Sequence, residues 1–227
     1  MTQQALLFAR TVVAVGAAIF ATAGALWQTS GVSAFLVCLA LAAVASTMKI
    51  RLPGLTGTIS PGFVFVLLAV GRLSWSETVI ISVVAGLVQC LWRATQPPGL
   101  LRLTFNAATM AIAGGLAYAV AHGLIPGAEG TPALLLAAAG VVLLVSNTML
   151  VSTIVCLSQS APLLTVWRAL QLCAVPYYLA GGVLASVWVR ADFAVGAWVP
   201  VLTMVTVYLL DTCYRQVLER MTPAVIR

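Results

Sequence analysis

Long apolar segments separated by short polar connections make up most of this 227-residue chain. A transmembrane helix needs about 20 mostly apolar residues, and eight segments approach that length. We expect these spans at Leu6–Trp27, Val32–Met48, Gly57–Leu73, Ser76–Trp92, Thr104–Ala121, Pro132–Leu157, Val166–Val189 and Phe193–Leu210. The third and fourth are short and polar at their ends, and a re-entrant third segment would lower the number of spans. The pattern therefore predicts an all-α, polytopic membrane helix bundle with about eight spans, within a range of six to eight.

The composition supports a membrane protein. Hydrophobic residues make up 62% of the chain and charged residues 7%, and the mean hydropathy is +1.11. A soluble domain carries roughly 25% charged residues. The net charge is +6, but no run of like charges is long enough to form a nucleic-acid-binding arm. We therefore expect the lipid bilayer to be a partner and nucleic acid not to be one.

The basic residues are distributed asymmetrically over the predicted connections. If the N-terminus is cytoplasmic, nine of the eleven Lys and Arg residues fall on the cytoplasmic side, and only Arg72 and Arg190 fall outside. The nine are Arg10, Lys49, Arg51, Arg93, Arg102, Arg168, Arg215, Arg220 and Arg227. Because cytoplasmic loops carry the excess of basic residues, we expect both termini in the cytoplasm and a location in the bacterial inner membrane. Residues 1–227 are predicted to form one transmembrane domain, with 211–227 as a short cytoplasmic tail.

A break rich in glycine and proline follows the second predicted span. The basic pair Lys49 and Arg51 comes first, and the residues of the break are Pro53, Gly54, Gly57, Ser60 and Pro61. Gly and Pro free backbone groups, and inside a bilayer these groups need partners from the protein or from a bound ligand. We predict that the break lies at the edge of the bilayer or dips into it. The rest of the chain is expected to be organised around the region 47–106.

Two stripes of small and polar residues follow helical spacing in the next two spans. They are Thr78, Ser82, Gly86 and Gln89 in the fourth span, and Asn106, Thr109, Ala113 and Ala117 in the fifth. Such stripes either pack helices together or line a polar pocket with the break. Asn147, in the sixth span, is a further amide that needs a partner inside a membrane.

The candidate ligand-binding residues are therefore Ser60, Gln89, Asn106 and Asn147. We expect the Asn106 amide to bond the backbone groups that Gly54, Gly57 and Pro61 leave free. At the end of the last span, Asp211 and Arg215 are four residues apart and are predicted to pair.

Signatures of catalysis and metal binding are missing from the sequence. The single histidine, His122, has no nearby carboxylate, and the five cysteines show no Cys-x-x-Cys or Cys/His metal spacing. Nucleotide-binding, zinc-protease and hydrolase motifs are also absent. We expect no enzymatic activity, no cofactor and no metal site, with the cysteines as buried free thiols.

Several motifs recur in a fixed order around the break. They are Leu52-Pro53-Gly54, Ser60, Phe63-Val64-Phe65-Val66-Leu67, Gln89 and Phe105-Asn106, within about 60 residues. This order resembles the multi-span membrane region at the N-terminus of bacterial diguanylate cyclases and HD-type phosphohydrolases. The resemblance implies a membrane-embedded sensory or ligand-binding module. The chain is also distantly similar to the substrate-binding membrane subunits of energy-coupling-factor vitamin transporters, which have six helices.

Three functional hypotheses follow from these patterns. The first is a non-enzymatic sensory or small-ligand-binding module. The chain has no G-G-D-E-F motif, so we expect such a module to pass its signal through a partner protein. The second is the membrane substrate-binding subunit of a small-molecule uptake system, which needs an energising partner. The third is an accessory structural subunit of a larger membrane complex, which needs no pocket.

Overall fold

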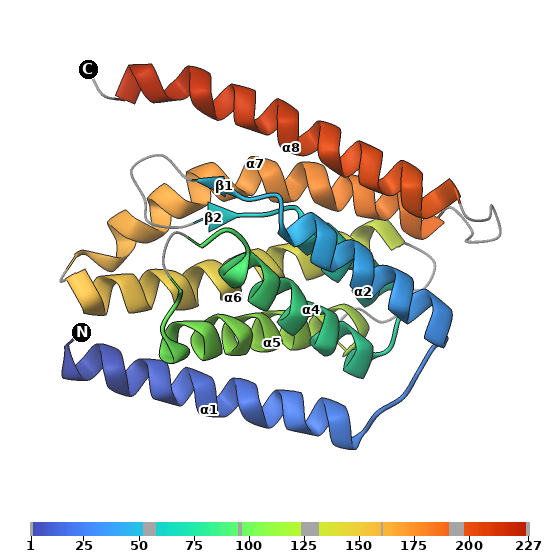
Figure 1. The fold of residues 1–227 in the computed structure, drawn as a ribbon, viewed down its shortest axis with the longest axis horizontal. Coiled ribbons are helices and arrows are strands. Elements are labelled where there is room, and N and C mark those ends of the chain that lie inside the picture. Colours follow the sequence, from blue (N-terminus) through green and yellow to red (C-terminus); the bar gives the residue numbers. More distant parts are fainter. Residues whose placement is uncertain are drawn as a thin grey trace.

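The computed structural model describes residues 2–51, 58–94, 97–123, 132–159, 161–190 and 198–225 (Figure 1). These ranges form a helix bundle with one pair of short strands, which confirms the all-α class. The helices are α1 (Gln3–Ala25), α2 (Val32–Ser46), α3 (Gly62–Arg72), α4 (Trp75–Leu91), α5 (Leu100–Gly123), α6 (Pro132–Gln159), α7 (Leu163–Arg190) and α8 (Trp198–Val225). Each of them overlaps one of the eight predicted segments.

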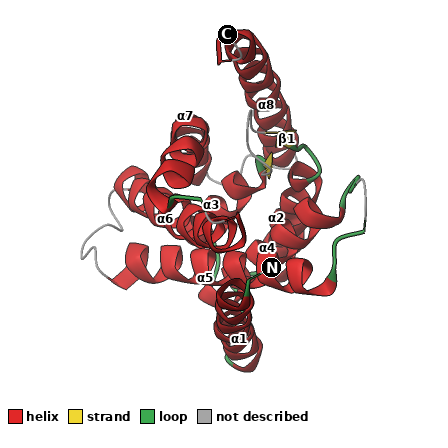
Figure 2. Ribbon diagram, turned by 90° about the vertical axis from the view of Figure 1, so that its left-hand side faces the viewer, coloured by secondary structure: helices red, strands yellow, loops and turns green. Residues whose placement is uncertain are grey.

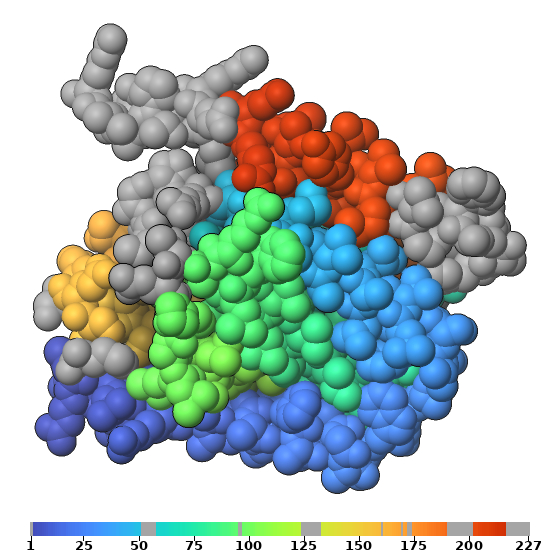
Figure 3. Space-filling view, in the orientation of Figure 1, coloured from blue at the N-terminus to red at the C-terminus, as the bar shows by residue number. Residues whose placement is uncertain are grey.

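Three helices among the described residues are long and apolar enough to cross a membrane. They are α1, α5 and the part of α6 from Ala133 to Gln159. Shorter apolar helices are α2, α3, α4 and the Ala174–Val189 part of α7. Figure 3 shows α1 (dark blue), α2 (light blue) and α8 (red) along one face of the molecule.

The short helix α3 lies in the middle of the bundle, with α2, α4, α5, α6 and α7 around it (Figure 2). Every residue from Gly62 to Val70 is buried, as expected for a helix that is apolar on all sides. At 1.5 Å per residue its length is about 16 Å, roughly half of a bilayer's hydrocarbon core. The helix α3 is therefore too short to cross a bilayer by itself.

The predicted third span, Gly57–Leu73, is longer than the helix that forms. Its residues Thr58–Ile59 form strand β2, which pairs antiparallel with β1 (Ile50–Arg51), and Ile50 faces Ile59 across the pair. Pro61 then serves as the N-cap of α3. The helix starts late because the chain returns to the bundle as a hairpin. Pro53, Gly54 and Gly57 of the predicted break lie outside the described residues.

Close contacts at glycine bring α1, α4 and α5 together. A Cβ atom added at Gly16 of α1 would lie 2.4 Å from the Cα atom of Ala108 in α5. One added at Gly114 of α5 would lie 2.1 Å from Oγ of Ser82 in α4. Thr78 and Ser82 are fully buried. These contacts indicate that Thr78 and Ser82 of the α4 stripe pack helices together and do not line a pocket.

At one end of the bundle, Glu77 ties the α1–α2 connection to the start of α4. Its carboxylate accepts hydrogen bonds from Thr29 Oγ1 at 3.0 Å, from the Ser30 N–H at 3.2 Å and from the Ser74 N–H at 2.9 Å. Ser74 and Glu77 also form a capping box. The carboxylate therefore joins two connections besides complementing the helix dipole.

At the opposite end, which we call the basic end, Lys49 joins α2, α4 and α8. Its Nζ donates to the Trp92 carbonyl, and its own carbonyl accepts from Arg215 Nη2 at 2.6 Å. Burial of the Lys49 side chain lowers the pKa of its ammonium group. These bonds hold the start of the β-hairpin between the end of α4 and the side of α8.

The predicted pair in α8 is confirmed. Arg215 Nε donates to Asp211 Oδ2 at 2.7 Å, and the Asp211 side chain is 4% exposed. Asp211 Oδ1 also accepts from the Tyr177 hydroxyl of α7 at 3.3 Å. Because α8 lies at the edge of the bundle (Figure 2), this buried carboxylate is a main attachment of α8 to α7. The helix continues past Asp211 to Val225.

Candidate functional site

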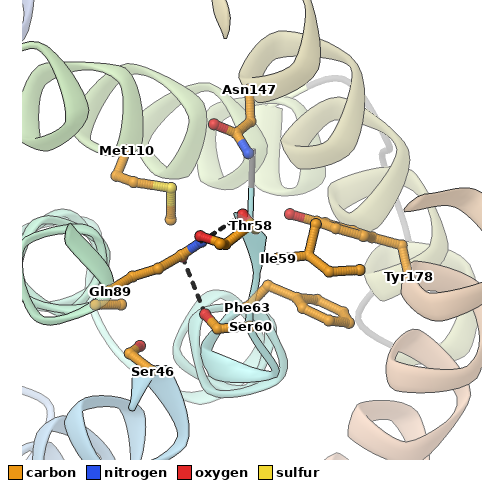
Figure 4. A pocket seen from close by; sticks show the side chains of 10 residues that line it. Ser46, Thr58, Ile59, Ser60, Phe63, Gln89, Met110, Asn147 and Tyr178 are labelled. Atoms are coloured by element: carbon orange, nitrogen blue, oxygen red, sulfur yellow. Dashed lines mark hydrogen bonds between the residues drawn. The ribbon is translucent and has the colours of Figure 1, made fainter. Parts of the chain in front are cut away.

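A small polar cavity lies at the N-terminus of α3 (Figure 4). It has about 30 Å³ of space, enough for about two water molecules. The lining residues are Ser46, Thr58, Ile59, Ser60, Phe63, Ala85, Gln89, Met110, Asn147 and Tyr178. They come from α2, the β2 turn and α3 to α7, so the cavity forms only when the bundle is assembled. Three of the four predicted binding residues, Ser60, Gln89 and Asn147, line it together.

Gln89 joins α4 to the segment that precedes α3. Its Oε1 accepts from Ser60 Oγ at 3.0 Å, and its Nε2 donates to the Thr58 carbonyl at 2.7 Å. Both bonds are visible in Figure 4. A side-chain amide therefore satisfies a backbone group beside the break, as the sequence indicated.

Asn106 does not have the place predicted for it. Its Nδ2 donates to Cys90 Sγ at 3.2 Å, and the α5 residue that lines the cavity is Met110, one helical turn later. Among the described residues, the bonds to the break segment come from Gln89 instead. Asn106 does not line this cavity, because the rotation of α5 directs this position toward the end of α4. Its predicted bonds to Gly54 and Gly57 lie outside the described residues.

One side-chain donor at the cavity has no partner in the described part of the chain, and it lies beside a helix N-terminus without a side-chain cap. Pro61 provides no side-chain cap for α3, and the first N–H groups of a helix have no intrahelical acceptor. The Ser46 hydroxyl is buried and makes no hydrogen bond. A Cβ atom at Gly62 would lie 2.1 Å from Ser46 Oγ, so this hydroxyl lies against the first residue of α3. An unpartnered buried polar group costs about 1–3 kcal/mol, and an acceptor at this point would relieve that cost.

Asn147 and Tyr178 enter the cavity from α6 and α7 (Figure 4). The Tyr178 ring stacks on Phe63 with centroids 4.0 Å apart, and its hydroxyl interacts with the Asn147 amide. Phe63 also contacts Tyr177, with ring centroids 5.4 Å apart. Tyr177 in turn bonds Asp211. One phenylalanine therefore contacts both the wall of the cavity and the attachment point of α8.

The sequence did not indicate Ser46. A single serine at the end of an apolar span is common and belongs to no stripe, so no pattern marks it. The sequence also does not indicate that the adjacent residues Tyr177 and Tyr178 contact different parts of the bundle. Tyr178 faces the cavity and Tyr177 faces α8 because neighbouring helical residues point about 100° apart.

The described lining of the cavity provides hydroxyl and amide groups and contains no charged side chain. The described residues also contain no cluster of three or more His, Cys, Asp or Glu that could hold a metal. Comparisons of the chain with protein families, curated proteins and solved structures find no match.

Proposed function

We propose that the chain is a multi-pass protein of the bacterial inner membrane, with about eight spans (six to eight) and both termini in the cytoplasm. Large apolar side chains on its surface support this, including Leu100, Leu179 and Val183, which are 77%, 63% and 66% exposed. Soluble monomers rarely expose large contiguous apolar surfaces. The basic end, with Lys49 and Arg215, is the end that we place in the cytoplasm.

Reporter fusions test this topology. A reporter that is active only in the cytoplasm should be active when fused after Arg227 and silent when inserted after Gly127. A reporter that is active only in the periplasm should give the reverse pattern. The proposed topology has an odd number of spans between Gly127 and Arg227, which places these two positions on opposite sides of the membrane. Equal activity of one reporter at both positions would contradict this topology.

We propose that the protein acts without catalysis, as a membrane-embedded module that binds a small polar ligand at the start of α3. The observation that carries this proposal is the unpartnered Ser46 hydroxyl beside the uncapped α3 N-terminus, inside a cavity lined by two amides. Hydroxyl groups and helix N–H groups both donate, and the positive end of the helix dipole favours negative charge. The expected ligand therefore presents an acceptor group, such as a carboxylate, to this point.

A route for a signal begins at the same cavity. Phe63 contacts Tyr178 at the ligand site and Tyr177 on the side of α8. A ligand that shifts Tyr178 would change the packing of Phe63 and the bond from Tyr177 to Asp211. In a sensory module, α8 and its cytoplasmic extension would pass this change to a partner protein.

Ser46→Ala separates ligand binding from structure. Removing an unpartnered buried hydroxyl should leave the unliganded protein at least as stable as the wild type, because no hydrogen bond is lost and the cost of about 1–3 kcal/mol for burying that hydroxyl is removed. Ligand affinity should fall about five- to tenfold, the effect of one hydrogen bond of roughly 1 kcal/mol. Native mass spectrometry of protein purified from its own membranes identifies the bound molecule, and titration with that molecule gives the affinities.

Thr109→Val is the matched control. Thr109 also has a buried hydroxyl without a partner in the described residues, but it does not line the cavity. This variant should bind the ligand as the wild type does. Absence of any co-purified small molecule, or equal affinities in all three proteins, would contradict the proposed site.

A second candidate function is the substrate-binding subunit of an uptake system. The half-length helix α3 favours it, because many transporters direct the N-terminus of a broken helix at an anionic group of the substrate. The proteins that co-purify distinguish the two functions. A partner with a cytoplasmic signalling domain supports the sensory module, and an ATPase with a transmembrane subunit supports uptake.

A further inference from the structure

A second and larger cavity lies between α2, α3, α7 and α8, toward the end of the bundle opposite the basic end. It has about 220 Å³ of space and shares no residue with the cavity at the start of α3. Its residues are Ser30, Ala34, Val37, Cys38, Leu41, Phe65, Leu68, Arg72, Leu73, Trp188 and Thr203. An empty apolar cavity of about 150 Å³ is large enough for benzene, so this one has room for a larger apolar group.

The lining is polar at one end and apolar along its depth. Arg72 is the last residue of α3, and Trp188 lies two residues before the end of α7. Deeper residues such as Leu41 and Phe65 are apolar. Arg72 lies seven positions after Phe65 in α3, about 10 Å along the helix axis. The cavity therefore has the polarity of an amphiphile with its polar group at the outer end.

The polar end contains the Arg72 guanidinium, together with the indole N–H of Trp188, which has no partner among the described residues. Arg72 Nη2 donates to the Val189 carbonyl, which holds the guanidinium at the end of α7. The indole Nε1 of Trp188 is buried and has no hydrogen-bond partner among the described residues. Buried indole N–H groups usually find an acceptor. An acidic oxygen at this position would accept from Trp188 and interact favourably with the charge of Arg72.

We infer that this cavity binds a fatty acid, with its carboxylate toward Arg72 and Trp188 and its chain between α2 and α3. We infer a single acyl chain from the size of the cavity. We infer an acidic head group because Arg72 provides a cation and Trp188 an indole donor. Val37 lines the cavity and is 39% exposed, so the cavity reaches the apolar surface of α2. An acyl chain can enter there from the bilayer without crossing water.

Quenching of tryptophan fluorescence by 2-bromododecanoic acid tests this site. The bromine lies next to the carboxylate and should quench Trp188, one of six tryptophans in the chain, in a saturable manner. Trp188→Phe should lose the saturable component. The methyl ester of the same acid, which has no charge, should bind the wild type at least tenfold more weakly. Absence of saturable quenching, equal quenching in Trp188→Phe, or equal binding of acid and ester would each overturn the proposal.

A matched pair of variants on α2 tests where the acyl chain of the fatty acid lies. Ala34→Phe fills the cavity and should weaken binding at least tenfold, whereas Ala40→Phe, at an exposed position of the same helix, should bind within twofold of the wild type. Wild-type affinity in a folded Ala34→Phe protein would overturn the assignment. Displacement of the acid by phosphatidylglycerol in nanodiscs would assign the cavity to membrane lipid and overturn the fatty-acid proposal. Ser46→Ala should leave this binding unchanged, so failure here is distinguishable from failure of the ligand site at the start of α3.

Discussion

Replacing Arg215 with methionine is expected to lower the free energy of unfolding by about 3 kcal/mol. The substitution leaves the Asp211 carboxylate buried without its cation, while the 3.3 Å hydrogen bond from Tyr177 stays in place. Removing one partner of a buried ion pair costs about 3–5 kcal/mol. Arg215 is 41% exposed while Asp211 is 4% exposed, so water weakens the pair and we expect the lower part of that range. Unfolding by titration with SDS in mixed micelles measures the difference.

The double variant Asp211→Asn with Arg215→Met is the control. An amide at position 211 carries no charge, and its oxygen still accepts from Tyr177. The double variant should therefore be more stable than Arg215→Met alone. If the two are equally destabilised, the loss comes from the bond between Arg215 and the Lys49 carbonyl and not from an uncompensated charge.

Gly16→Ala is expected to destabilise the protein by about 2 kcal/mol, within the range for overpacking. The new methyl group would lie 2.4 Å from the Cα atom of Ala108. A backbone atom cannot rotate away as a side chain can, so α1 must move away from α5. We expect this loss of stability even though alanine is more favourable than glycine within a helix by about 1 kcal/mol. The same SDS titration measures it.

Gly24→Ala on the same helix provides the comparison. Nothing lies within 4 Å of a Cβ atom added at Gly24, so only the gain in helix propensity remains. This variant should be as stable as the wild type or more stable by up to about 1 kcal/mol. Effects of opposite sign at the two positions would locate the α1–α5 contact at Gly16. A similar loss at both positions would mean that α1 does not pack through Gly16.

Local regularities made part of the fold predictable. The pair of Asp211 and Arg215 depends only on i, i+4 spacing within one helix, so it could be read before any tertiary contact was known. The boundaries of most helices agree within a few residues for the same reason. There are two exceptions. Pairing of β1 with β2 removes the first residues of the predicted third span from α3, and α8 continues to Val225, beyond the predicted end at Leu210.

The candidate site was predictable only in part. Gln89 and Ser60 were expected near the break and lie there, because Gln89 sits at the end of α4 on the side of β2. Asn106 was expected beside them and instead bonds Cys90. Both amides belong to stripes with the same spacing. Spacing indicates which residues share a face of one helix, but it does not set the rotation of that helix against its neighbours.

The sequence by itself determined the helical class and the order of the apolar segments, because apolar segments of sufficient length are a local property of the chain. Only the tertiary structure placed α3 at the centre and brought Ser46 against Gly62. It also turned Tyr177 and Tyr178 toward different partners and left room between α2, α3, α7 and α8. Each of these depends on contacts between residues far apart in the chain. Such contacts are decided by how all the helices pack at once.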